Sequence, residues 1–278
     1  MNLHVIHTGN FKLDGGAMFG VVPKTLWERT NPADEKNLCS WSMRCLLVEQ
    51  GEQLVLIDNG IGNKQSEKFF SHYYLHGEQS LMGSLQHAGF KPDDITDMFH
   101  THLHFDHCGG GVLQTGDNSY ELAFPKARYW SHRDHWKWAT EPNAREKASF
   151  LTENIQPIED SGHLFFVGEE SPFTNIDLIT VDGHTDKQML PKISYKEHTI
   201  VFVADLLPSV GHIPLPYVMG YDTRPLLTLQ EKAAFLKEAA DRKYVLFLEH
   251  DPVHECCTVK HTDKGVRLDE TFPLADIL

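Results

Sequence analysis

One short stretch of the chain holds four side chains that can bind a metal ion. Residues 100–111 read His-Thr-His-Leu-His-Phe-Asp-His-Cys-Gly-Gly-Gly, which gives the ordered spacing His-x-His-x-Asp-His over His102, His104, Asp106 and His107. Three imidazoles beside one carboxylate favour a borderline transition metal over the all-oxygen cages of calcium and magnesium. One tetrahedral zinc accepts about four ligands, and a catalytic zinc leaves one position to water. Two metal positions are therefore compatible with this stretch.

The residues on either side of this stretch predict a strand followed by a turn into a helix. Residues 97–100 end an apolar run, and the glycines at 109–111 allow a sharp turn. His102 and His104 are two residues apart, so they can point the same way from an extended segment. We expect the four donors on a strand-to-helix loop. A histidine-rich surface loop is disfavoured, because the spacing is ordered and lies between an apolar strand and a glycine turn.

Residues 101–107 resemble the metal motif of the metallo-β-lactamase-fold hydrolases, and further segments of that family follow in the same order. These segments are Leu-Ile-Asp-Asn-Gly at 56–60, Gly-His-Thr at 183–185, Val-Ala-Asp at 203–205 and Glu-His-Asp at 249–251. The resemblance covers most of the chain. It implies an α/β fold of the metallo-β-lactamase type, a four-layer αβ/βα sandwich, which we expect to form a single domain over residues 1–278.

The resemblance also implies a dinuclear metal site. The first ion is held by His102, His104 and His184, the second by Asp106, His107 and His250, and Asp205 bridges the two. The expected cofactors are two divalent ions, zinc first, with manganese, cobalt or iron as alternatives. Asp58 ends an apolar strand and is expected either to accept a hydrogen bond from a ligand imidazole or to bond its own turn. Gly183 is expected to permit an unusual backbone angle before His184.

Hydrolysis is the chemistry expected of such a site. Two divalent ions lower the pKa of a bound water toward neutrality and can hold a bridging hydroxide, so that no serine or cysteine nucleophile is needed. One ion also polarises the carbonyl or phosphoryl oxygen under attack. Asp106 or Asp205 is then expected to handle the proton of the leaving group. We predict a small lactone, ester or phosphotriester as substrate.

The choice of substrate depends partly on a second resemblance. Residues 15–20 and 22–24 resemble the superfamily branch of lactonase-like and methyl parathion hydrolase-like enzymes. Met18 and Phe19 are expected either to form an apolar lip over the site or to plug one end of the sandwich. Lactonases commonly place a tyrosine shortly after the bridging aspartate, whereas Leu206 follows here. This difference weakens the prediction of a lactonase but does not exclude it. Three further residues could contact substrate: His212, Tyr217 and Tyr221. For each of them a structural role is the favoured alternative.

Three alternatives stay open: a thioester hydrolase of glyoxalase II type, an iron-dependent redox enzyme and a non-catalytic metal-binding protein. The first calls for a helical region with basic glutathione contacts, which the short acidic C-terminal portion does not clearly show. The flavodiiron pattern uses a carboxylate at the position of His104. We expect His132 and His135 to be ordinary surface or partly buried histidines, because the ligand set is complete without them.

Composition narrows the class of partner. The 278 residues are 41% hydrophobic, enough for one large α/β domain, and the net charge of −14 disfavours nucleic acid and anionic lipid as partners. No stretch reaches the roughly 18 apolar residues of a membrane helix. The five cysteines are an odd number without C-x-x-C spacing, so reduced thiols are expected. We predict a cytoplasmic enzyme acting on a small molecule, with the choice between monomer and homodimer open.

Overall fold

Alternating and apolar runs of the sequence form strands in two separate sheets. The computed structural model describes residues 1–117, 119–168 and 170–278. The chain divides into two compact units, the first made of residues 1–9 and 43–172 and the second of residues 10–42 and 173–278. Each unit is described by itself below.

The six-stranded sheet of the first unit carries the metal motif at the end of a strand. Its order is β1 (Asn2–Asp14), β2 (Leu38–Gln50), β3 (Gln53–Ile57), β4 (Asp97–Phe99), β7 (Arg128–His132) and β8 (Leu164–Val167), with the far ends of β1 and β2 belonging to the second unit. The sequence predicts a β-hairpin of residues 41–49 and 53–57 around Gly51, and the pairing of β2 with β3 confirms it, with Gly51 at φ +59° in the turn. Strands β3 and β4 are parallel, and Ile57 pairs with Phe99. Asp58 and His100 therefore leave the sheet at the same edge.

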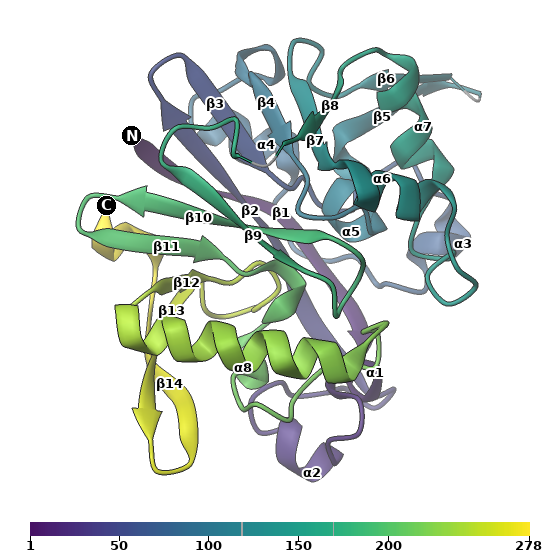
Figure 1. Ribbon diagram of the computed structural model, residues 1–278. Helices are drawn as coiled ribbons and strands as arrows, with labels where there is room; N and C mark the ends of the chain where they lie inside the picture. The colour runs from purple at the N-terminus through teal and green to yellow at the C-terminus, as the bar shows by residue number, and fades with distance from the viewer. Residues whose placement is uncertain (118, 169) are drawn as a thin grey trace. The chain divides into compact units, whose positions relative to one another are not determined.

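Helices and a small hairpin complete the first unit (Figure 1). They are α3 (Glu67–Phe70), α4 (Leu81–His87), α5 (Phe105–Cys108), α6 (Arg133–Thr140), α7 (Thr152–Asp160), β5 (Val112–Gly116) and β6 (Ser119–Leu122). Leu56, Met98 and Leu103 are fully buried in the core of this unit, which α4, α6 and α7 share.

The sequence predicts a helix over residues 144–155, and this prediction is wrong for its first half. Helix α7 begins only at Thr152. The side chain of Asn143 accepts hydrogen bonds from the backbone N–H groups of Arg145 and Glu146, at 2.9 and 3.1 Å. These bonds cap a single turn, which the Lys147 N–H closes on the Asn143 carbonyl at 3.0 Å. The Ser149 carbonyl then accepts from the Phe105 N–H at 2.9 Å instead of continuing a helix. Residues 143–150 are therefore a connecting segment.

The second unit is built on another six-stranded sheet. Its strands, in sequence order, are β9 (Ile176–Val181), β10 (Gln188–Tyr195), β11 (His198–Phe202), β12 (Val245–Phe247), β13 (Cys256–Thr262) and β14 (Gly265–Phe272), and neighbours in sequence are neighbours in the sheet. Strands β11 and β12 are parallel, with Phe202 opposite Phe247. Asp205 and His250 therefore follow strands that end at the same edge. In the C-terminal tail, β14 pairs with β13 in antiparallel orientation.

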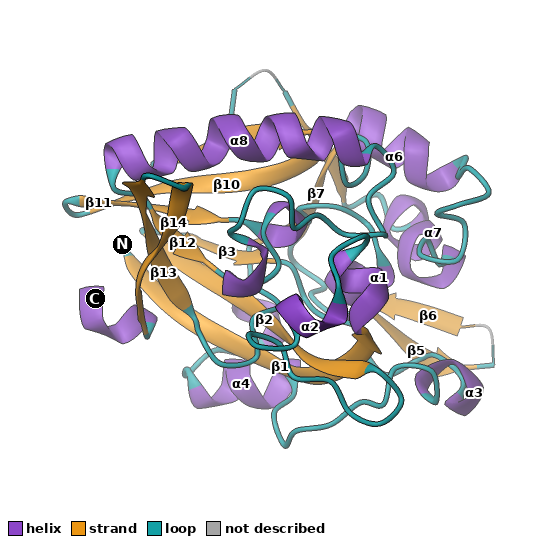
Figure 2. Cartoon of the chain, turned by 90° about the horizontal axis from the view of Figure 1, so that it is seen from below, coloured by secondary structure: helices purple, strands orange, loops and turns teal. Residues whose placement is uncertain are grey.

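Helix α8 (Pro225–Arg242) runs along this second sheet (Figures 1 and 2). The sequence predicts a capping box of Thr228 and Glu231 and helical character from Glu231 to Ala240; this start is wrong. The helix begins at Pro225, whose ring fixes φ near the helical value in the first turn. Thr228 and Glu231 thus lie inside α8, where the Thr228 hydroxyl donates to the Arg224 carbonyl of the preceding turn at 3.4 Å.

Helices α1 (Gly15–Phe19) and α2 (Lys24–Trp27) belong to the second unit. Met18 and Phe19 are 2% and 0% exposed, so they pack inside this unit and form no apolar lip. The Phe19 ring stacks on Trp27 and on His212, with ring centroids 5.2 and 4.4 Å apart. His212 also hydrogen-bonds the Met18 carbonyl at 2.9 Å, and burial lowers its pKa to about 3. Its role is structural.

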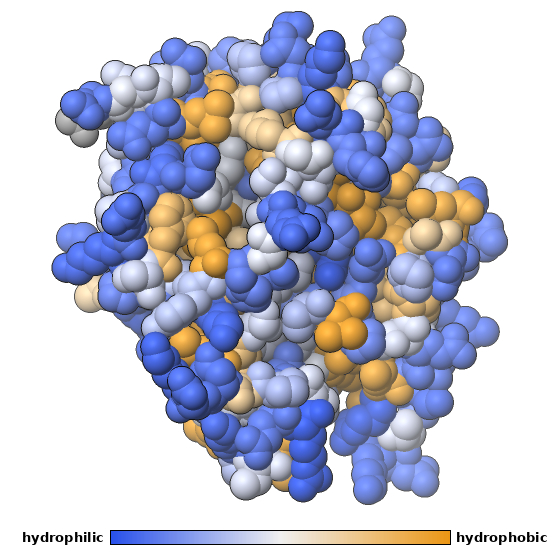
Figure 3. Space-filling view, turned by 180° about the vertical axis from the view of Figure 1, so that it is seen from behind, coloured by the Kyte–Doolittle hydropathy of each residue, from blue (hydrophilic) through white to orange (hydrophobic). Residues whose placement is uncertain are grey.

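Hydrophilic side chains predominate on the face shown in Figure 3, with apolar ones scattered among them. None of the described helices combines the length and the hydropathy that crossing a membrane requires. All five cysteines lie within the described residues, and their side chains are buried.

Candidate metal centre

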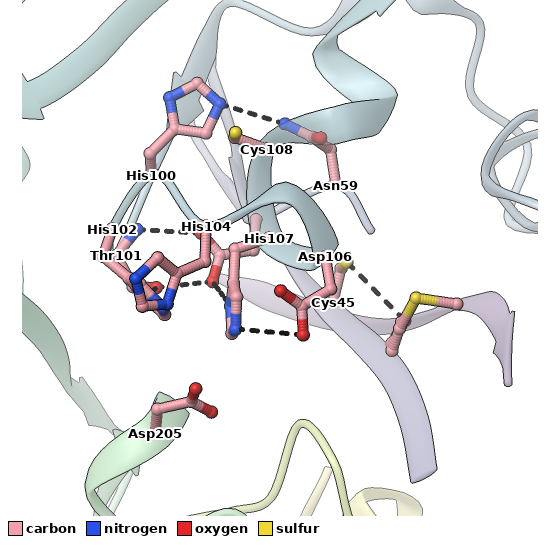
Figure 4. A network of polar contacts seen from close by, with 12 residues as sticks. Cys45, Asn59, His100, Thr101, His102, His104, Asp106, His107, Cys108 and Asp205 are labelled. Atoms are coloured by element: carbon pink, nitrogen blue, oxygen red, sulfur yellow. Dashed lines mark hydrogen bonds and ion pairs between the residues drawn. The ribbon is translucent and has the colours of Figure 1, made fainter. Parts of the chain in front are cut away.

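The structure brings the four donors of the His-x-His-x-Asp-His motif together in the first unit (Figure 4). His104 is the N-cap residue of α5, so Asp106 and His107 lie in its first turn, and all four side chains are buried. Nε2 of His102 lies 3.1 Å from Nδ1 of His104. Two nitrogens bound to one tetrahedral zinc at the usual bond length would be roughly 3.4 Å apart. The predicted strand-to-helix loop is confirmed, and its two leading imidazoles have the spacing of ligands to one ion.

Asp58 holds this loop. Its carboxylate accepts hydrogen bonds from the backbone N–H and the hydroxyl of Thr101, at 2.8 and 2.6 Å. Nδ1 of His107 donates to Oδ2 at 3.1 Å, the same oxygen that accepts from the Thr101 hydroxyl. Of the two roles expected for Asp58, the bond to a ligand imidazole is the one observed. The bond leaves Nε2 of His107 as the nitrogen available to a metal.

The glycines after the motif are required by close packing. A Cβ atom on Gly109 would lie 2.1 Å from the carbonyl oxygen of Ile61, and one on Gly110 would lie 2.2 Å from that of Asn59. Neither glycine has a positive φ. The backbone of residues 59–61 therefore packs directly against the end of the metal loop and fixes the position of α5.

Two further side chains of the first unit support the loop, and the sequence did not identify either. Glu146, which is 3% exposed, places Oε1 3.4 Å from Nε2 of His104. His135, which is 1% exposed, accepts a hydrogen bond from the Leu103 backbone N–H at 2.8 Å. The expectation that His135 is an ordinary surface or partly buried histidine is wrong, because α6 carries its ring beneath the metal loop.

In the second unit the structure brings together His184, Asp205 and His250. Nε2 of His184 lies 3.0 Å from Oδ2 of Asp205, and Nε2 of His250 lies 3.0 Å from Oδ1. Each carboxylate oxygen thus faces a different imidazole. A carboxylate that bridges two metal ions must offer one oxygen to each ion. The two oxygens of Asp205 point to different imidazoles, which is compatible with that role.

The outer nitrogens of both imidazoles have acceptors. Nδ1 of His184 donates to Oδ1 of Asp222 at 3.0 Å, and Nδ1 of His250 donates to the Ser42 carbonyl at 2.7 Å. Burial by itself lowers the pKa of His184, but Asp205 and Asp222 raise it to about 10. The site therefore favours a positive charge between these carboxylates. A divalent cation supplies that charge, so the donor set fits a metal.

Helix α8 positions the segment that carries His184. Oε1 of Glu231 accepts from the backbone N–H of Asp182 at 2.7 Å, and Oε2 accepts from that of Gly183 at 3.0 Å. A Cβ atom on Gly183 would lie 2.4 Å from the Thr228 backbone nitrogen. The expected unusual backbone angle at Gly183 is not observed. Glycine is needed here because the segment approaches the helix backbone closely.

Residues 44–250 match the family model of the metallo-beta-lactamase superfamily, and that range contains all seven predicted ligands. The chain belongs to this superfamily. It is 32% identical over 234 residues to an N-acyl homoserine lactonase of Bacillus cereus, covering 79% of this chain and 84% of the relative. A Bacillus thuringiensis N-acyl homoserine lactonase is 29% identical over 114 residues, and the alignment spans 44% of that relative and 35% of this chain.

Solved structures agree with this membership. A probable metal-dependent hydrolase from Staphylococcus aureus superposes with a TM-score of 0.88 at 28% identity, covering 98% of this chain and 96% of the other. AidC, a dizinc quorum-quenching lactonase, has a TM-score of 0.79 at 24% identity, covering 98% and 95%, and shares the fold. The predicted α/β metallo-β-lactamase-like fold, the lactonase-like resemblance and the class of metal-dependent hydrolase are confirmed. The glyoxalase II, iron-redox and non-catalytic alternatives are not favoured.

Proposed function

We propose that this chain is a dinuclear metal-dependent lactonase. The proposed ligands are those expected from the motif: His102, His104 and His184 for one ion, Asp106, His107 and His250 for the other, and Asp205 as the bridge. The observation that carries the proposal is the Asp205 carboxylate, whose two oxygens face two different buried imidazoles. The 3.1 Å separation of the His102 and His104 nitrogens supports it independently.

The chain's own residues orient the ligand imidazoles and supply a carboxylate for proton transfer. Three of the ligand imidazoles each donate a hydrogen bond from Nδ1, which leaves Nε2 for the metal. The acceptors are Asp58 for His107, Asp222 for His184 and the Ser42 carbonyl for His250. When bound, two divalent ions supply a water of lowered pKa and polarise the substrate carbonyl. We assign the transfer of the leaving-group proton to Asp106 or Asp205, whose carboxylates are 8% and 7% exposed.

A lactone is the substrate class that the relatives support best. The Bacillus cereus relative is an N-acyl homoserine lactonase, and it aligns with most of this chain. The absence of a tyrosine directly after Asp205 is the one sequence feature that weighs against this class. Tyr217 and Tyr221, on the loop between Asp205 and α8, stay candidates for substrate contact, while His212 does not.

A substrate panel on protein of known metal content tests the proposal. We expect kcat/KM for N-acyl homoserine lactones to exceed that for aryl esters and phosphotriesters, and chelation followed by zinc, manganese or cobalt to remove and restore activity. Metal-loaded protein that hydrolyses only the esters or phosphotriesters would overturn the substrate class. Metal-loaded protein inactive on all three classes would overturn the lactonase function.

Several finer expectations stay predictions. They are zinc as the identity of both ions, a cytoplasmic location, a single domain over residues 1–278, a small-molecule partner without nucleic acid or membrane, and the choice between monomer and homodimer. Metal analysis of the purified protein and its mass in solution address the first and the last of these.

A further inference from the structure

The segment between α6 and α7 forms a brace against the metal loop of the first unit. We call residues 143–150 the brace segment. The Ser149 carbonyl accepts a hydrogen bond from the Phe105 backbone N–H at 2.9 Å, directly after His104. The ring of Phe150 lies 4.9 Å from that of His104. The brace segment therefore contacts the metal loop through both its backbone and its side chains.

Glu146 is the buried carboxylate of this segment, and groups outside the metal loop orient it. Oε2 accepts hydrogen bonds from the Trp138 indole N–H, at 2.7 Å, and from the Asn143 amide. Burying a carboxylate costs several kcal/mol unless donors compensate it. With Oε2 held by these two donors, Oε1 faces Nε2 of His104 at 3.4 Å. The direction of Oε1 is thus set independently of the histidine.

This contact distinguishes the two nitrogens of the His104 ring. A carboxylate beside Nε2 stabilises the proton on that nitrogen, so Nδ1 keeps its lone pair. Nδ1 is the nitrogen that lies 3.1 Å from Nε2 of His102. His102 has the opposite arrangement, since its Nδ1 lies 3.1 Å from the Thr101 hydroxyl. The two neighbouring histidines therefore offer different nitrogens to the same point.

We propose that Glu146 is a positioning residue that selects the His104 tautomer with an unprotonated Nδ1 and so prepares this ring to bind metal. The inference rests on the proposed metal-dependent function and extends it to a residue outside the ligand set. The carboxylate also makes the imidazole a stronger donor, since a hydrogen-bonded anion increases ligand basicity. Glu146 acts through His104 and takes no part in bond making.

Replacing Glu146 with glutamine tests this role, because it keeps the shape and changes one contact. The amide oxygen can still accept from Trp138 and Asn143, which turns the NH2 group toward Nε2 of His104. That donor favours the wrong tautomer, with the proton on Nδ1. We expect Glu146→Gln to weaken metal binding about 10- to 100-fold in competition with a chromophoric chelator. Nitrogen-15 NMR of zinc-loaded wild-type protein should show His104 protonated at Nε2.

Two variants make the experiment decisive. Glu141→Gln removes a carboxylate at the exposed end of α6 and should leave metal affinity within twofold of wild type. Trp138→Phe removes one donor to Glu146 and should weaken metal binding several-fold; it decides the question if Glu146→Gln does not fold. Unchanged affinity in Glu146→Gln, or in Trp138→Phe in that case, overturns the proposal. Wild-type protein that binds metal but opens no lactone would refute only the proposed function.

Discussion

Asp222 and His184 form a buried pair in which Oδ1 of the carboxylate lies 3.0 Å from Nδ1 of the imidazole. The other oxygen of Asp222 accepts from the Met219 backbone N–H at 3.2 Å, which orients the carboxylate. The pair connects the loop before α8 to a proposed metal ligand. A metal-bound histidine usually has such a partner for its second nitrogen.

The first prediction concerns this pair. We expect Asp222→Asn to lower metal affinity about 10- to 100-fold, because the amide removes the negative charge that stabilises the Nδ1 proton of His184. Affinity is measured by chelator competition. Asp241→Asn is the matched control, since Asp241 is an exposed carboxylate of α8. Equal metal affinity in the Asp222 variant and the control would contradict the assignment.

The second prediction concerns the proposed ligands themselves. His104→Ala and Asp205→Ala should each sharply reduce both metal content and hydrolysis, because the first removes a nitrogen donor and the second removes both oxygens of the proposed bridge. Metal content is read by elemental analysis of protein dialysed against a weak chelator. Unchanged metal stoichiometry in both variants would refute the ligand set, whatever happens to the rate.

The third prediction concerns the close approach of Gly183 to α8. Gly183→Ala places a methyl group 2.4 Å from the Thr228 backbone nitrogen, so the His184 segment must shift. We expect a loss of roughly 1–3 kcal/mol in the free energy of unfolding, measured by denaturant titration, together with weaker metal binding. At Gly168 an added Cβ meets no atom within 4 Å, so Gly168→Ala serves as the control. A Gly183 variant as stable as this control would show that the contact relaxes freely.

The fourth prediction concerns pH and the buried Lys232 of α8. Its ammonium donates to the carbonyls of Pro214 and Tyr217, at 3.0 and 2.7 Å, and burial lowers its pKa to about 7. Between about pH 7 and the ordinary lysine value near 10.5, the unfolded chain binds this proton and the folded protein does not. Lys232 therefore adds a term that makes stability rise with pH across this window.

A comparison of two proteins isolates that term. The free energy of unfolding of wild type and of Lys232→Met is measured by denaturant titration between pH 6.5 and 10. The two proteins differ in no other titrating group. We expect the free energy of unfolding of wild type to increase relative to that of the methionine variant as pH rises. Parallel profiles for the two proteins would mean that Lys232 keeps its proton in the folded state.

The sequence predicted the metal motif, the β2–β3 hairpin and the role of Asp58 because each depends on local spacing or on residues at strand ends. It missed Glu146 and Asp222, since both meet their histidines only after the chain has folded. Glu146 lies 42 residues after His104, and Asp222 lies 38 residues after His184. No local pattern marks either carboxylate as different from the many acidic residues on the surface.

The errors in secondary structure have the same origin. Asn143 caps only a single turn, because the Ser149 carbonyl accepts from the Phe105 N–H of the metal loop instead of continuing the predicted helix. At α8, the pairing of Thr228 with Glu231 predicted a helix start, whereas Glu231 accepts from the backbone before His184. In both places contacts that form only in the folded protein override a helix signal that the local sequence contains.

The placement of Glu146 and Asp222 on connecting segments limits how this scaffold can be redesigned. Loops are the usual targets when substrate range is altered by grafting or by shortening. In this protein the connection between α6 and α7 and the loop before α8 each contribute one anion to a histidine. An exchanged loop must bring an equivalent carboxylate to the same nitrogen. Otherwise the redesigned protein will lose metal before any new selectivity can be measured.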